Sequence, residues 1–155
     1  MTSTAETDKE RLDRQLVELF QGLRVAVTGV QVLFAFLLTV PFSVGFEKLD
    51  ALGLRLFFLS LVTAAIASIS FIAPAAQHRV LFREGLKKEL VHRSNRYGIG
   101  GTVALAISMS AACAVVVRAF WSHNLSVGLG LLVLLLCIWA WFVQPFLTLR
   151  RNHRV

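Results

Sequence analysis

Four long blocks of apolar residues, separated by shorter polar stretches, organise this chain of 155 residues. Each block holds about 20 residues, and an α-helix of that length crosses the hydrocarbon core of a bilayer. The pattern therefore predicts four transmembrane helices at about residues 22–41, 52–73, 97–120 and 126–146. The fold class we expect is all-α: a four-transmembrane-helix bundle forming a single membrane domain over residues 1–155.

The first apolar block carries a row of polar and small residues. They recur at spacings of three and four, which puts them on one helical face: Gln21, Arg24, Thr28, Gln31 and Ala35. We call Arg24, Thr28 and Gln31 the polar stripe. A helix that faces only lipid has no reason to sort its residues in this way, so we expect the polar stripe to turn toward other helices. The Gln31 amide needs hydrogen-bond partners there, and the candidates are Thr28, Ser60, Ser68 and Ser108.

Small residues at intervals of four mark packing faces on two other blocks. In the third block they form a ridge that would let another helix approach closely: Gly100, Ala104, Ser108 and Ala112. The second block carries a similar row: Ser60, Ala64 and Ser68. The fourth block is the most apolar and has few small residues, which predicts that most of its circumference faces lipid.

The polar segments predict further helical structure outside the blocks. Residues 1–18 begin with a tail, and the spacing of Thr7 and Glu10 fits a capping box that starts an amphipathic helix near Asp8. This helix is either a solvated lead-in at the membrane interface or a docking helix for a partner. We expect Pro41 to end the first block or to tighten its exit, and Pro74 to end the second.

Residues 75–96 form the one long polar connection. Phe82, Leu86 and Leu90 recur every four residues, so the segment can form a helix with one apolar edge, lying along the membrane surface. Six basic residues surround that edge and would contact anionic lipid headgroups: Arg79, Arg83, Lys87, Lys88, Arg93 and Arg96.

The distribution of basic residues predicts the orientation. If both termini are cytoplasmic, 13 of the 16 Lys and Arg residues lie on the cytoplasmic side, and Lys48, Arg55 and Arg118 lie outside. The positive-inside rule favours this arrangement, which makes the chain a multi-pass plasma-membrane protein with cytoplasmic N and C termini. On the outer side, the long Arg55 side chain can reach the membrane interface or pair with Glu47 or Asp50. The polar N-terminal segment does not resemble a cleaved signal peptide, so we expect the first block to remain as an anchor.

The composition and the positions of the charged residues argue against several kinds of functional site. The chain is 56% hydrophobic and carries a formal charge of +7, but its basic residues flank the apolar blocks, which does not indicate nucleic-acid binding. All nine acidic residues lie outside the blocks or at their edges, and the four histidines lie in loops or the tail. Cys113 and Cys137 are best interpreted as small buried hydrophobic residues. We therefore expect no catalytic site, no metal site and no cofactor, and a protein that is not an enzyme.

Two functions remain in different classes. The first is a structural or interaction role in the membrane, with self-association or binding to another membrane protein. The alternative is a small oligomeric ion or solute transporter or channel, in which Arg24, Thr28 and Gln31 line a polar path.

Three segments resemble a known family. They are the run LRVAVTGVQVLFAFLLTVPF at 23–42, APAAQHRVLFR at Ala73–Arg83, and Asn95 with Arg96 before the third block. The resemblance is to an uncharacterised family of small four-helix membrane proteins common in actinobacteria. It covers nearly the whole chain beyond the tail, and Arg24, Gly29, Gln31 and 34–42 are its most specific part. It implies a bacterial plasma-membrane location and no established activity, although some relatives are labelled sodium-proton antiporters.

Overall fold

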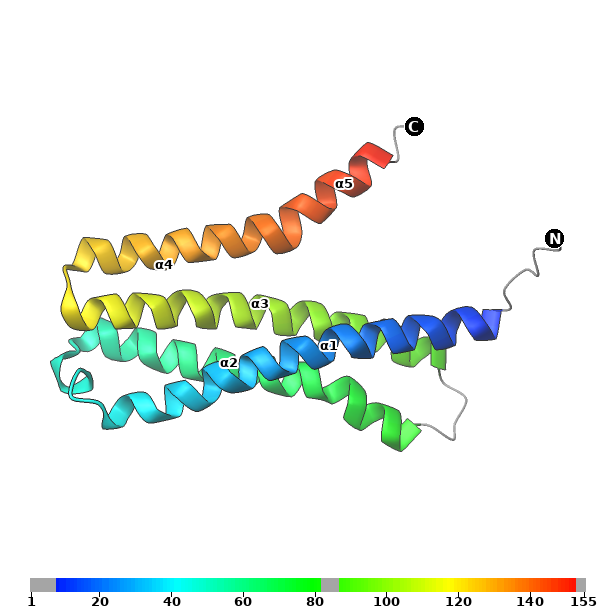
Figure 1. Cartoon of the computed structure of the whole chain (residues 1–155), viewed down its shortest axis with the longest axis horizontal. Helices are drawn as coiled ribbons and strands as arrows, with labels where there is room; N and C mark the ends of the chain where they lie inside the picture. The colour runs from blue at the N-terminus through cyan, green and yellow to red at the C-terminus, as the bar shows by residue number, and fades with distance from the viewer. Residues whose placement is uncertain (1–7, 82–86, 153–155) are drawn as a thin grey trace.

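In the computed structural model the four predicted transmembrane helices run side by side, as Figure 1 shows. The structure describes residues 8–81 and 87–152, and it describes side chains at 14, 17–79 and 90–151. These residues form helices and turns and contain no strand. In chain order the helices are α1 (Asp8–Thr39), η1 (Val40–Phe42), η2 (Phe46–Lys48), α2 (Ala51–Leu81), α3 (Lys87–Phe120), α4 (His123–Ile138), η3 (Trp139–Val143) and α5 (Gln144–Asn152).

The two ends of the bundle differ in which helix ends and connections lie there. At one end, here called the basic end, α1 and α3 begin and α2 and α5 end (Figure 1). At the other, the turn end, the connections between α1 and α2 and between α3 and α4 lie together. Four helical segments are long and apolar enough to cross a membrane: Val17–Phe42, Ala51–Arg79, Leu90–Phe120 and His123–Arg151. The chain is accordingly an all-α, multi-pass membrane protein.

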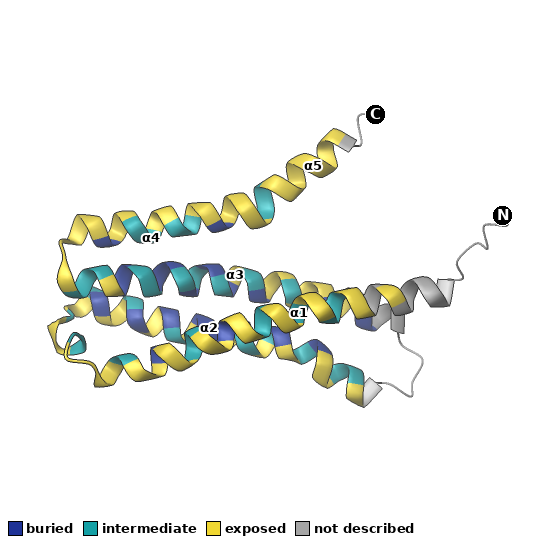
Figure 2. Cartoon of the chain, in the orientation of Figure 1, coloured by how far each residue is buried: buried dark blue, intermediate teal, exposed yellow. Residues whose placement is uncertain are grey.

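The core lies between α2 and α3, which α1 and α4 flank. Burial within the chain is highest for the apolar window of α3, at 44%, and lowest for that of α1, at 11%. Figure 2 shows the same contrast, with buried residues concentrated on α3 and mostly exposed residues on α1, α4 and α5. Apolar side chains of α1 close the core in two clusters, around Val30 near Phe71 and around Leu37 near Phe57.

Pro41 acts as expected, and the helix near Asp8 is present. The regular α-helix of α1 begins at Asp8, ends at Thr39 and gives way to a short 3₁₀ turn that contains Pro41. Thr7 lies outside the described residues, and the Glu10 side chain is not described. The structure does not test the predicted capping box itself.

The expectation that Pro74 ends the second helix is wrong. Pro74 is buried inside α2, which continues to Leu81. A proline deprives the chain of one helical hydrogen bond, and transmembrane helices tolerate this where neighbouring groups compensate. Alanines on both sides of Pro74 also favour helix.

The described parts of residues 75–96, at 75–81 and 87–96, therefore do not form a separate surface helix. The first part extends α2, and the last part begins α3 at Lys87. Leu90, expected on a membrane-facing apolar edge, is buried in the bundle at 4% exposure. Phe82 and Leu86 lie outside the described residues.

The fourth membrane helix bends near its end. A π-helical turn at Trp139–Val143 precedes Pro145, and the chain then continues as α5 to Asn152, beyond the predicted end of the fourth span near residue 146. Proline and π-turns are the usual causes of helix kinks. The bend carries α5 away from α3, as Figure 1 shows. At the other end of the helix, α4 already begins at His123, three residues before the predicted start of the fourth span near residue 126.

Candidate functional site

The polar stripe lies on the outside of the chain. Arg24, Thr28 and Gln31 are exposed, whereas α1 packs through Val30 and Leu37. Within a single chain, the expectation that the stripe faces other helices is wrong. The physical reason is that α2 and α3 present apolar side chains to α1 and use their own polar groups for each other.

The hydroxyl groups considered as partners for Gln31 are occupied elsewhere. The Thr28 hydroxyl donates to the Arg24 carbonyl oxygen of its own helix at 3.1 Å. Ser68 donates to the carbonyl of Ala64 in the same way. Ser60 and Ser108 bond to each other's helices, as described next. Gln31 is left exposed near the centre of the membrane-spanning part of α1.

A reciprocal pair of serines joins α2 to α3. The Ser60 hydroxyl donates to the Ser108 carbonyl oxygen at 2.9 Å, and the Ser108 hydroxyl donates to the Ser60 carbonyl oxygen at 2.8 Å. Both residues have 0% exposure, so the bonds lie in the dry interior of the bundle. Each hydroxyl thereby finds an acceptor on the neighbouring helix and ties the two backbones together.

The other residues of the small-residue ridge take different positions. Ala104 is buried in the same core, and Ala112 is half-buried against the cluster around Leu37. Gly100 is exposed, and a Cβ added to it would meet nothing within 4 Å. The close approach is made by Gly101 instead, where an added Cβ would lie 2.6 Å from Cε1 of Phe71.

The contact between α3 and α4 also uses small residues, and these were not predicted from the sequence. The Ser126 hydroxyl donates to the Ala114 carbonyl oxygen at 2.7 Å. One turn further, a Cβ on Gly130 would lie 3.1 Å from the Ala114 Cβ. The spacing of four between Ser126 and Gly130 was the available signal, but it is a single pair in a strongly apolar block.

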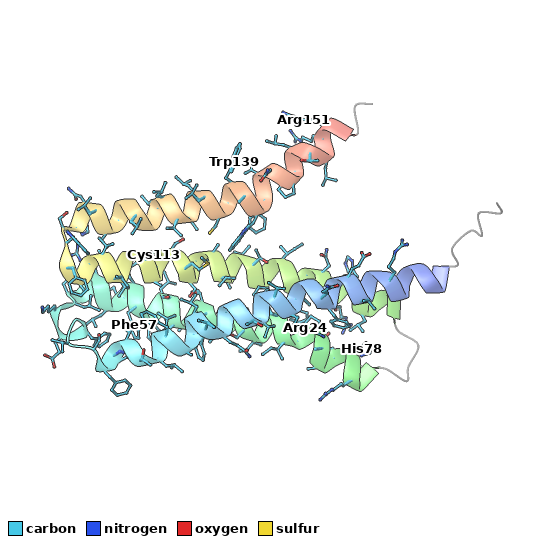
Figure 3. All side chains as sticks on the ribbon, in the orientation of Figure 1. Arg24, Phe57, His78, Cys113, Trp139 and Arg151 are labelled. Atoms are coloured by element: carbon cyan, nitrogen blue, oxygen red, sulfur yellow. The ribbon has the colours of Figure 1, made fainter. Side chains whose placement is uncertain are left out.

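Two cavities flank α2 at the basic end. One, of about 490 Å³, lies between α1 and α2, and its lining includes Arg24, His78 and Arg79. The Phe20 ring packs edge-on against His78 there, at 5.5 Å between centroids. Figure 3 shows Arg24 and His78 in the same region of neighbouring helices.

The second cavity, of about 610 Å³, lies between α2 and α3. Its described lining includes Ser70, His92, Arg93, Arg96, Tyr97 and Gly100. Of the six residues predicted to contact anionic headgroups, the structure thus gathers Arg93 and Arg96 at this cavity and places Arg79 at the other. Arg83 lies outside the described residues, and the side chains of Lys87 and Lys88 are not described.

A charged cluster holds the turn end together. Asp50 precedes α2, accepts the Gly53 backbone N–H at 3.0 Å and pairs with Arg118 at the end of α3. The hydrogen bonds from Arg118 hold the pKa of the Asp50 carboxyl well below its usual range. Arg118 also donates to Nδ1 of His123, the first residue of α4. Asp50 is thus paired with Arg118, whereas the sequence suggested Arg55 as a possible partner.

The described residues offer little to a metal ion. They contain no group of three or more His, Cys, Asp or Glu side chains that could hold one. Cys113 is half-buried, Cys137 is buried, and both are free thiols.

Comparison with known proteins adds one finding. A family described as a family of unknown function (DUF6328) matches residues 5–145. No curated protein and no solved structure matches the chain.

Proposed function

We propose that this chain, which belongs to the DUF6328 family of unknown function, is an interaction protein of the bacterial plasma membrane that self-associates through the polar stripe of α1. The observation that carries the proposal is the exposure of Gln31 near the middle of the Val17–Phe42 span. An amide in hydrocarbon has no water to bond to, so another protein group is its natural partner.

A second copy of the chain fits this requirement. Copies inserted with the same orientation are related by an axis along the membrane normal, so Gln31 of one copy meets Gln31 of the other at the same depth. A glutamine side chain carries both donors and an acceptor, so two of them can bond to each other. The neighbouring Thr28 and Ala35 are small and exposed on the same face, which allows close approach.

The low burial of α1 supports self-association through the polar stripe. Only 11% of its apolar window is buried within the chain, and the exposed side includes Leu38 beside the polar stripe. Arg24 lies seven residues before Gln31, roughly 10 Å nearer the basic end, and can extend its guanidinium toward the membrane interface. The stripe therefore presents its amide inside the bilayer and its charge at the edge.

The proposed orientation places the basic end in the cytoplasm. Lys48 lies at the turn end, and Arg151 lies at the basic end. With Cys113 and Cys137 replaced by alanine, Lys48→Cys should react with an impermeant thiol reagent from outside intact cells, and Arg151→Cys should not. The reverse labelling pattern would overturn the orientation.

The Gln31→Leu variant tests the function itself. Membrane hydrogen bonds contribute about 0.6–2 kcal/mol, so the variant should dissociate roughly 3-fold to 30-fold more readily in detergent, measured by light scattering. Phe36→Leu, on an exposed apolar position of the same helix, is the control. Liposome flux measured on the same proteins separates the alternative class: loss of flux with association unchanged would favour a conduit over an interaction protein.

A further inference from the structure

We propose that the 610 Å³ cavity between α2 and α3 binds the phosphate group of an anionic phospholipid. Its lining of Ser70, His92, Arg93, Arg96 and Tyr97 supplies the recognition. The site is separate from the α1 stripe, so it does not depend on self-association.

The chemistry of the lining matches a phosphate. Two guanidinium groups, an imidazole, a phenol and a serine hydroxyl all offer hydrogen-bond donors, and arginine suits the geometry of phosphate oxygens. None of the described lining residues is acidic. The site also unites two helices, because Ser70 comes from α2 and the other residues come from α3.

Three of the lining residues share one face of α3. His92, Arg96 and Gly100 follow one another at intervals of four, so they lie on one face of α3. Gly100 has open space where a side chain would stand. The absence of a side chain at this position keeps the cavity open beside the two polar residues.

An uncovered apolar surface continues from the cavity into the membrane. One turn further toward the turn end, Ile66 follows Ser70 on α2 and Val103 follows Gly100 on α3, with exposures of 48% and 43%. Farther along, α4 covers α2 and α3, since a small cavity there is lined by residues of all three helices. The bend before α5 ends that cover, and an acyl chain can lie along the exposed part.

This continuity favours a lipid over free phosphate as the source of the anion. Phosphate in solution would use only the polar lining, whereas a phospholipid also covers Ile66 and Val103 with its chains. Burial of apolar surface against an acyl chain adds to the attraction between the arginines and the headgroup.

The test titrates the purified full-length protein in neutral detergent with phosphatidylglycerol and follows the rise in melting temperature. Phosphatidylcholine and inorganic phosphate are tested in parallel at equal concentration. We expect phosphatidylglycerol to stabilise the wild type at the lowest concentration of the three. Arg96→Gln should weaken its binding roughly fivefold. Arg151→Gln, which removes the same charge from α5, should leave binding unchanged.

A variant that keeps every charge gives an independent test. Gly100→Leu should fold, since nothing lies within 4 Å of the added Cβ, but its side chain would fill the cavity and reduce phosphatidylglycerol binding. Equal weakening by Arg96→Gln and Arg151→Gln would reduce the effect to general surface charge and overturn the site. Equal protection by inorganic phosphate would overturn the lipid as its occupant. Undiminished binding to Gly100→Leu would place the lipid elsewhere.

Discussion

Gly100 and Gly101 are adjacent glycines of α3 with opposite surroundings, and replacing each by alanine tests the packing of the bundle. A Cβ on Gly101 would lie 2.6, 2.8 and 3.1 Å from three ring atoms of Phe71. Ordinary carbon contacts are about 3.5–4.0 Å, so the ring would have to move by about 1 Å. Phe71 is only 3% exposed and packs against Val30, Ala67 and Ala104, which leaves it little room.

The expected size of the effect follows from two terms. Overpacking of a well-packed core costs about 1–3 kcal/mol. Alanine gains up to about 1 kcal/mol over glycine within a helix, and this term is common to both positions. Gly101→Ala should therefore be less stable than Gly100→Ala by about 1–3 kcal/mol, with Gly100→Ala equal to or above the wild type.

The assay is reversible unfolding of the two variants and the wild type in mixed micelles, under identical conditions. Because the two substitutions are chemically identical and one residue apart, differences in expression or detergent binding should be small. Equal stability of the two variants would refute the close packing of Gly101 on α3 against Phe71 on α2. Greater loss in Gly100→Ala would favour the ridge expected from the sequence.

Two further sets of variants test contacts between helices. The double variant Ser60→Ala with Ser108→Ala removes the two hydrogen bonds between α2 and α3 and should cost about 1 kcal/mol of stability in the same unfolding assay. The control Ser110→Ala removes a hydroxyl that bonds within its own helix, so it should cost almost nothing. Equal losses of stability would mean that the serine pair does not join the helices. Asp50 has a pKa lowered by Arg118, so its stabilising contribution is present above its unfolded pKa of about 3.9 and is lost as pH falls further. Melting temperatures measured from pH 7 to pH 3 should therefore fall more steeply below about pH 4 for the wild type than for Asp50→Asn, and parallel curves would contradict the pairing.

The sequence predicted the four-helix fold because block length and hydropathy are local properties. Residues 52–73 and 126–146 could be read as spans without any knowledge of their neighbours. The helix ends were less predictable. Pro74 has the local signal of a helix end, but the packing of α2 overrides it, and Pro145 lies inside a bent helix in the same way.

The orientation of each face was harder to predict, because it depends on the partners. The row from Gly100 to Ala112 predicted a packing face, and the structure places Ala104 and Ser108 in the core but substitutes Gly101 for Gly100. Gln31 was expected to face the bundle. Instead α1 packs against the core through apolar residues on another face of the helix, such as Val30, and Gln31 is exposed. The cavity with Arg96 could not be foreseen, since Ser70 and Arg96 are brought together only by the folded pair of helices.

Disulfide cross-linking at the polar stripe tests the central claim of self-association most directly. In a chain with Cys113 and Cys137 replaced by alanine and Gln31 kept, cysteine is introduced at Thr28 or at Gly29. These adjacent positions have similar depth but point about 100° apart around α1, and Gly29 has open space for the new side chain. Oxidation in native membranes should give a cross-linked dimer with Thr28→Cys and little with Gly29→Cys. Equal cross-linking at both positions, or none at Thr28→Cys, would contradict association through this face.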